Sequence, residues 1–376
     1  MFFKAKILDW RLLLGCSLGI IFLYVSLPSD KEVSDFDELA LGTENIVMLG
    51  KVDDLAIHCH DLNDFDNCLS SYEKGGDERP VLLWLGNSQL HAINQYKSGD
   101  ETAAPELHRR FQEQGDYFLT LSQPNASLLE HYLLFAFALN RLPVTMLALP
   151  VVFDDMREDG IRENLIDALK DQDTVDLLYR TTIGQQLISN YGDKDAAGNE
   201  MAALEDTFQE SSEKLLNAKL EEIWPIWANR STLRGNSINM LYQFRNWSLG
   251  INPSSSRKII PGRYKKNKNA LIALLELANE QGVEVLLYIV PLRNDVKIPY
   301  EAYEYSSFKT DIADIANKNN TQFVDLENLV PSELWGTKDS TTIGGNQELD
   351  FMHFQEGGHR LLAEKLFQEL SLIKSD

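Results

Sequence analysis

The chain has 376 residues, enough for one large or two ordinary domains, and 44% of them are hydrophobic, which is sufficient for a buried core. Its formal net charge of −22 at pH 7 argues against nucleic acid as a partner, because phosphates repel an acidic surface. The acidity suits a protein that must stay soluble in an exposed compartment.

An uncharged apolar run from residue 12 to residue 27 lies close to the N-terminus. Lys4, Lys6 and Arg11 precede the run, and an acidic stretch follows it. Because positive flanks stay in the cytoplasm, we predict a single-pass anchor over residues 1–28. The N-terminus would then be cytoplasmic, and the body would lie on the periplasmic side of the inner membrane. A cleaved signal peptide is the alternative, but no small-x-small cleavage site follows the run.

Residues 29–80 are polar and rich in aspartate, and we interpret them as a juxtamembrane linker with an irregular lead-in. Of the three cysteines, Cys16 lies in the apolar run, which leaves Cys59 and Cys68 as a pair in the exported part. We expect these two to form a disulfide in an oxidising compartment. The sequence His58-Cys59-His60 also suggests a metal site, but its spacing matches no zinc pattern, so we predict no metal.

From residue 81 onward, short apolar runs alternate with amphipathic segments, as strands joined by helical crossovers do. This alternation predicts an α/β fold in three layers, with a flavodoxin-like parallel sheet in the middle layer. The expected strands are 81–85, 117–121, 144–149, 284–290 and 322–325, and the expected helices are 105–114, 126–139, 267–281, 305–318 and 357–371.

The alternation is interrupted between residues 156 and 263, where charged amphipathic segments carry little strand signal. We predict a helical insertion over residues 156–263, within a domain that spans residues 81–376. The clearest helix of the insertion is expected at residues 205–220. Loops after the strands of such a sheet lie on the functional edge, so this insertion is either a lid or docking surface or a helical decoration without a role.

Ser88 comes directly after the first expected strand, in the sequence Gly86-Asn87-Ser88-Gln89. Asp350 and His353 stand three residues apart before the last expected helix, so one loop can hold both. A carboxylate that fixes the imidazole tautomer and an imidazole that takes the hydroxyl proton would make serine a nucleophile. The alternative is that Ser88 caps a helix and His353 is a satisfied core histidine.

These two blocks resemble the first and last motifs of the SGNH (GDSL-type) hydrolase family, and the N-terminal anchor resembles that of the DltD-like members. The resemblance covers the chain from about residue 81 to its end, apart from the insertion. It implies that Ser88 is the nucleophile, that His353 is the general base and then acid, and that Asp350 orients the imidazole. It implies an acyl-enzyme without a cofactor and a multi-pass membrane acyltransferase as a partner.

The oxyanion hole departs from the family pattern. The family has a glycine after its second strand and an asparagine after its third, and this chain has neither at those places. Asn125, or the N–H of Ala126, is our candidate substitute after the second strand, although Asn125 can equally be a turn or capping residue. After the fourth strand, Arg293 is a candidate for holding an anionic or polyhydroxyl substrate, unless it forms a structural ion pair.

Two classes of function follow from these residues. The first is a serine esterase or O-acyltransferase acting on an acylated cell-envelope glycan or another ester. The second is a catalytically degenerate scaffold that binds envelope glycan or a membrane acyltransferase. The Ser88, Asp350 and His353 pattern favours the first class, and the missing oxyanion residues favour the second.

Overall fold

Six parallel strands form the central sheet in the computed structural model, which describes residues 45–60, 62–75, 78–192, 256–338 and 347–375. Their order is β10-β9-β8-β5-β7-β4, so the five longer strands follow the flavodoxin-like order 2-1-3-4-5. Their bounds are β4 His58–Cys59, β5 Val81–Gly86, β7 Tyr117–Ser122, β8 Val144–Val151, β9 Glu284–Ile289 and β10 Gln322–Asp325.

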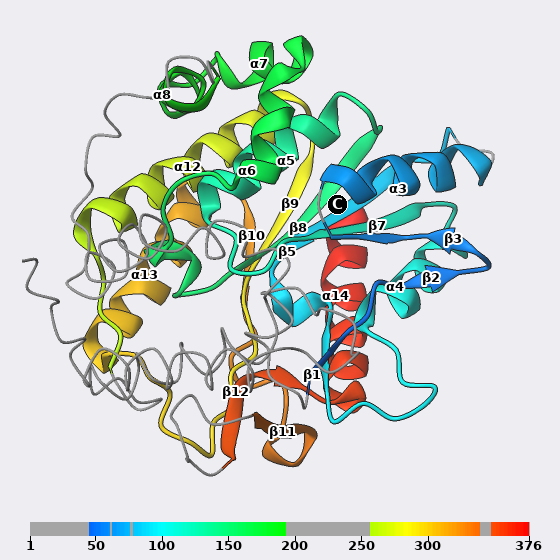
Figure 1. Cartoon of the computed structure of the whole chain (residues 1–376), viewed down its shortest axis with the longest axis vertical. Coiled ribbons are helices and arrows are strands. Elements are labelled where there is room, and N and C mark those ends of the chain that lie inside the picture. The colour runs from blue at the N-terminus through cyan, green and yellow to red at the C-terminus, as the bar shows by residue number, and fades with distance from the viewer. Residues whose placement is uncertain (1–44, 61, 76–77, 193–255, 339–346, 376) are drawn as a thin grey trace, which may run out of the picture. The chain divides into compact units, whose positions relative to one another are not determined.

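The central strands are apolar because helices cover both faces of the sheet. Every residue of β5 and β7 is buried, as expected of a parallel sheet between two helical layers. Helices α5 and α12 pack side by side over one face, while α4 and α14 pack together over the other (Figure 1). The helices bounding these layers are α4 Ala103–Gln112, α5 Leu128–Leu139, α12 Pro261–Glu280, α13 Ala302–Lys318 and α14 Glu356–Ser375.

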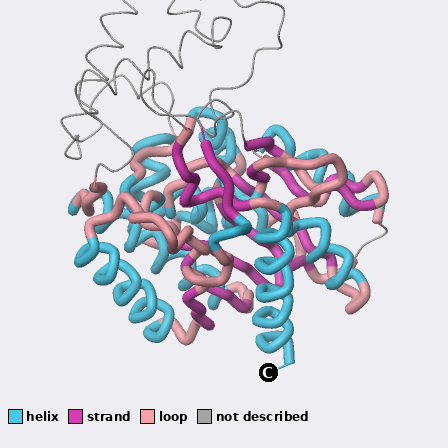
Figure 2. The backbone as a smooth tube through the Cα atoms, turned by 90° about the horizontal axis from the view of Figure 1, so that it is seen from below, coloured by secondary structure: helices cyan, strands magenta, loops and turns pink. Residues whose placement is uncertain are grey.

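Local sequence signals explain where these helices begin. The Ser127 hydroxyl caps α5 by accepting a hydrogen bond from Glu130 N–H. The Glu130 carboxylate in turn accepts a hydrogen bond from Ser127 N–H. Pro261 starts α12, where its missing N–H and fixed φ cost nothing. The five strands and five helices expected from residue 81 onward all occur, with ends that differ by a few residues. Figure 2 shows the strands enclosed by helices in a second view.

Residues 45–75, which the sequence analysis assigned to a linker and lead-in, contain regular structure. Helix α3 (Leu62–Lys74) and strand β4 belong to this segment, and β4 adds a sixth strand to the edge of the sheet beside β7. Farther upstream, β1 (Asn45–Val47) pairs antiparallel with β6 (Ala92–Asn94), and β2 (Lys51–Val52) pairs with β3 (Leu55–Ala56). A disulfide joins Cys59 of β4 to Cys68 of α3, with a Cα–Cα distance of 6.4 Å.

Part of the predicted insertion lies within the described residues. Between β8 and residue 192 the chain forms only helices and turns: η2 Asp155–Arg157, α6 Glu163–Ile166, η3 Asp167–Lys170, α7 Gln172–Leu178 and α8 Thr182–Tyr191. The predicted anchor over residues 1–28, the linker up to residue 44 and the predicted helix 205–220 lie outside the described ranges. None of the helices in those ranges is both long and apolar enough to cross a membrane.

Candidate active site

Strand β5 delivers Ser88 to the carboxyl edge of the sheet. The strand ends at Gly86, and a 3-10 turn, η1 (Ser88–Leu90), follows immediately. A Cβ at position 86 would lie 2.4 Å from a methyl carbon of Leu90, so any larger residue there would force the Leu90 side chain to move. Asn87 caps the turn, accepting a hydrogen bond from Gln89 N–H at 3.1 Å. The capping residue is therefore Asn87, and the Ser88 hydroxyl is left to make another contact.

Asp350 and His353 lie on a strand, whereas the sequence analysis expected a loop. Strand β12 (Glu348–Phe354) pairs antiparallel with β11 (Trp335–Lys338), and α14 begins two residues after β12 ends. The register shifts between Trp335 and Thr337, and Asp350 Oδ1 accepts the backbone N–H groups of both Met352 and His353. This local bend is what lets two residues three apart in a strand face each other.

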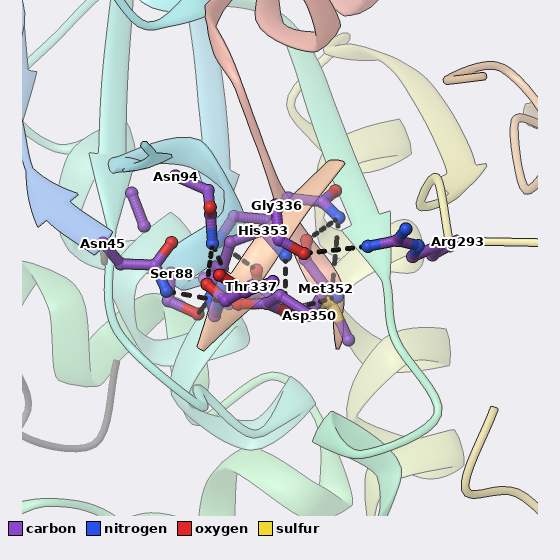
Figure 3. A network of polar contacts seen from close by, with 12 residues as sticks. Asn45, Ser88, Asn94, Arg293, Gly336, Thr337, Asp350, Met352 and His353 are labelled. Atoms are coloured by element: carbon purple, nitrogen blue, oxygen red, sulfur yellow. Dashed lines mark hydrogen bonds and ion pairs between the residues drawn. The ribbon is translucent and has the colours of Figure 1, made fainter. Parts of the chain in front are cut away.

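A continuous hydrogen-bonded chain connects the three predicted residues (Figure 3). Ser88 Oγ lies 3.0 Å from His353 Nε2, and His353 Nδ1 lies 3.0 Å from Asp350 Oδ2. The side chain of His353 is 12% exposed and that of Asp350 only 2%, so the carboxylate is shielded while part of the imidazole reaches solvent. The first distance allows proton transfer from the hydroxyl to the imidazole, and the second allows a hydrogen bond from the imidazole to the carboxylate.

Asp350 is held in its ionised form by its surroundings. Burial alone would raise the pKa of this carboxyl, but the charge and hydrogen bond of His353, the charge of Lys338 and the N–H of Met352 outweigh it and hold the pKa well below its usual range. Asn45 Nδ2 donates a further hydrogen bond to Oδ2 at 3.2 Å. An ionised carboxylate in this position fixes one tautomer of the imidazole and stabilises its protonated form.

Gln89 ties the turn that carries Ser88 to the strand that carries His353. Its amide Nε2 donates to the carbonyl oxygens of Met352 at 2.7 Å and Pro291 at 2.9 Å. The side chain is fully buried, so water does not compete for these bonds. The hydrogen bond from Gln89 to Met352 therefore fixes the position of the Ser88 hydroxyl relative to the His353 imidazole.

Arg293, the predicted substrate-binding residue, is buried in an ion pair. Its guanidinium makes two bonds to the Asp295 carboxylate, at 2.6 and 3.1 Å, and a third to the carbonyl oxygen of Gly336 at 2.8 Å. The side chain is 8% exposed. These contacts correspond to the structural ion pair that the sequence analysis held as the alternative, and they fasten the loop after β9 to β11.

The turn after β7 supplies few donors for an oxyanion. Asn125 adopts a left-handed conformation with φ +48°, is exposed, and accepts a hydrogen bond from Arg162 at its carbonyl oxygen. The N–H of Ala126 is bound to Gln123 O, and the N–H of Gln123 is bound to Gly86 O. Ser88 N–H is the first of η1, where backbone N–H groups have no acceptor within the helix, so it stays our candidate oxyanion donor.

A buried cluster of histidines lies behind the nucleophile turn. Ser122 Oγ, at the end of β7, lies 2.7 Å from His58 Nε2 and 2.7 Å from His91 Nδ1. Burial, with the nearby histidines, lowers the pKa of His58 to about 3 and that of His91 well below its usual value, so both rings are neutral at physiological pH. In the described ranges, no three histidine, cysteine, aspartate or glutamate side chains are arranged to hold a metal ion.

Several residues of the site were not predicted from the sequence. Asn45 and Asn94 approach Asp350 from paired strands, and Gln89 bridges to β12. Of these three residues, only Gln89 lies in a motif that the sequence analysis singled out, directly after Ser88. The two asparagines carry no local signal, because their partner is more than 250 residues away along the chain.

Comparisons with known proteins give similarities at low identity. No protein-family model matches the chain, and no curated protein matches it. Among solved structures, a putative acylhydrolase from Bacteroides fragilis has 10% identity and a TM-score of 0.35, covering 81% of this chain and 96% of its own. A psychrotrophic esterase of Pseudoalteromonas has 10% identity and a TM-score of 0.37, with coverages of 79% and 99%. An acetyl-xylooligosaccharide esterase from Geobacillus has 11% identity and a TM-score of 0.35, with coverages of 77% and 93%. The case for a function therefore rests on the site itself.

Proposed function

We propose that this chain is a membrane-anchored serine esterase or O-acyltransferase of the SGNH type, acting on an acyl ester of a cell-envelope glycan. The observation that carries the proposal is the unbroken chain from Ser88 Oγ through His353 to Asp350, with 3.0 Å at each step. A buried, ionised carboxylate behind an accessible imidazole is the arrangement that activates a serine hydroxyl.

The proposed reaction has two steps. Ser88 Oγ attacks the acyl carbonyl carbon while its proton moves to His353 Nε2, and Ser88 N–H stabilises the resulting oxyanion. The alcohol of the ester then leaves with that proton, which yields the acyl-enzyme. Water or a sugar hydroxyl next gives its proton to His353 and attacks the acyl carbon. The bond between that carbon and Ser88 Oγ breaks, His353 returns the proton to Ser88 Oγ, and a free acid or a new ester is released.

The glycan substrate, the inner-membrane location and the multi-pass acyltransferase partner rest on the predicted anchor and on the family resemblance. The triad chemistry is the same for hydrolysis and transfer, and the outcome depends on whether water or a sugar hydroxyl reaches the acyl-enzyme first. Adding a polyol acceptor to a reaction with an activated acetyl ester separates the two, since transfer produces an acetylated polyol and hydrolysis produces only acetate.

A fluorophosphonate probe tests the proposal on the full-length protein, because it reacts with activated serines. We expect covalent labelling at Ser88, none in Ser88→Ala, and a loss of at least about a thousandfold in rate for His353→Ala. Asp350→Asn should lose rate while keeping its circular dichroism spectrum. Labelling that persists in Ser88→Ala would contradict the proposed nucleophile.

A second candidate function is a scaffold of the same fold without catalysis. It is favoured by the turn after β7, where the N–H groups of Gln123 and Ala126 are already bound within the protein. A folded protein that binds envelope glycan in calorimetry, and whose Ser88 never reacts with the probe, would support this second candidate.

A further inference from the structure

Two asparagines from a pair of short strands converge on the carboxylate of Asp350. Asn45 of β1 and Asn94 of β6 stand directly opposite each other in an antiparallel pair. Asn45 Nδ2 donates to Asp350 Oδ2 at 3.2 Å, and Asn94 Nδ2 approaches the same oxygen at a longer 3.5 Å (Figure 3). Asp350 Oδ2, which accepts the hydrogen bond from His353, therefore also accepts hydrogen bonds from the β1–β6 strand pair.

Asn94 is held in place from its other side. Its Nδ2 donates to Thr337 O at 2.9 Å, and its Oδ1 lies so close to Gly336 that a Cβ there would be 1.7 Å away. Position 336 therefore admits only glycine unless Asn94 moves. This packing joins β6 to the β11–β12 hairpin and keeps β1 against Asp350.

We propose that Asn45 is a positioning residue for Asp350, so that a strand from the N-terminal segment completes the active site. This inference rests on the proposed function, since it assigns Asn45 a role in the Ser88, His353 and Asp350 chain. Asn45 lies between the predicted anchor and residue 81, where the βα alternation starts. The folded domain that holds the active site would therefore begin before residue 81.

The physical reason is the number of bonds that fix the carboxylate. Oδ1 accepts two backbone N–H groups, and Oδ2 is shared between His353 Nδ1 and the amide of Asn45. Asp350 is 1% exposed, so water cannot readily replace a lost donor. Without the Asn45 amide, Oδ2 has fewer restraints, and the imidazole bound to it is less well aligned with Ser88.

Other titratable groups also lie near this site and must stay unchanged in a test. Lys338 acts on Asp350 from β11. His91, which follows η1, and His359, on α14, lie within electrostatic range of His353. Burial, the largest cause, lowers the pKa of His91 and brings that of His359 to about 4, so both rings are neutral at physiological pH. None of these residues is changed in the variants chosen below.

The first measurement is the rate of fluorophosphonate labelling of the full-length protein as a function of pH. We expect Asn45→Ala to lower the maximal rate about tenfold, as the loss of a hydrogen bond to a charged group would. Asn45→Asp should restore part of that rate, because two carboxyl groups at this distance share one proton, and the shared proton replaces the amide donor to Asp350. A purely structural role for Asn45 would leave the two variants equally slow. Ile46→Ala is the control, since Ile46 is on the same strand and 44% exposed.

The second measurement needs no activity. The proton between His353 Nδ1 and Asp350 should give a downfield NMR resonance that disappears in His353→Ala. We expect Asn45→Ala to shift or broaden this resonance and Ile46→Ala to leave it unchanged. An unchanged resonance in Asn45→Ala, or wild-type labelling and pH profile in both Asn45 variants, would overturn the inference. Absence of Ser88 labelling with a shifted resonance would instead reject the proposed reaction and leave the role of Asn45 intact.

Discussion

Gln89 donates a hydrogen bond to the carbonyl oxygen of Met352 at 2.7 Å, joining the residue after Ser88 to the residue before His353. The two partners are 263 residues apart in the chain. The distance between the hydroxyl and the imidazole thus depends on a buried amide that does not itself contact either reactive atom.

Replacing Gln89 by leucine should slow labelling of Ser88 by about ten- to a hundredfold, because both carbonyl bonds are lost and the two halves of the site can separate. The melting temperature should fall as well, since two buried carbonyl oxygens lose their donor. Gln185→Leu is a matched control, because Gln185 also donates to a carbonyl oxygen, that of Tyr179, but from an exposed position on helix α8. Equal labelling rates in the two variants would contradict a positioning role for Gln89.

The Cys59–Cys68 disulfide closes a loop with a sequence separation of nine. Changing both cysteines to serine should lower the free energy of unfolding by about 2–3 kcal/mol, mainly because the unfolded chain is no longer constrained. Urea denaturation of the wild type with and without a reductant measures the same quantity without mutation. Rapid alkylation of both cysteines in freshly isolated, unreduced protein would show that the bond is not formed in the cell.

His131→Leu should stabilise the protein, and more so in acid. His131 is fully buried in α5, neither ring nitrogen has a hydrogen-bond partner in the described part of the chain, and burial lowers its pKa to about 3. Because the unfolded pKa is about 6.5, the unfolded chain binds this proton as the pH falls below 6.5 while the folded protein does not. His131 therefore lowers the free energy of unfolding of the wild type progressively as the pH falls from about 6.5 toward 3.

Urea denaturation at pH 8 and pH 5 checks this prediction. The stabilisation by leucine should be about 2 kcal/mol larger at pH 5, which corresponds to 1.5 pH units below the unfolded pKa. An equal gain at both pH values would mean that His131 is not the source of the pH dependence.

The predicted anchor has a topological consequence. A C-terminal alkaline phosphatase fusion should be active, since the basic residues before the apolar run at 12–27 should keep the N-terminus in the cytoplasm. The protein should also remain with membranes after a carbonate wash. An inactive fusion would mean the opposite orientation, and release by the wash would mean that no anchor is retained.

The central sheet could be predicted because its inner strands are buried on both faces. A parallel strand between two helical layers is a short continuous apolar run, and Val81–Leu85 and Tyr117–Leu121 are such runs. The same reasoning places Ser88 at the carboxyl edge, since it comes directly after the first run. Strand β4 could not be predicted, because it has only two residues and belongs to a polar segment.

The amino-acid sequence was enough to predict the five longer strands and five of the helices in their order, the position of Ser88 after a buried strand, and the spacing of Asp350 and His353. These are local properties that hydrophobic periodicity and short spacings record. The folded structure was needed to see that β12 is a strand, that Arg293 forms an ion pair, and that Asn45 and Gln89 contact the segment that carries Asp350 and His353. Each of these depends on a contact between distant segments, and a polar side chain in an otherwise unremarkable segment carries no sign of which buried partner it will meet.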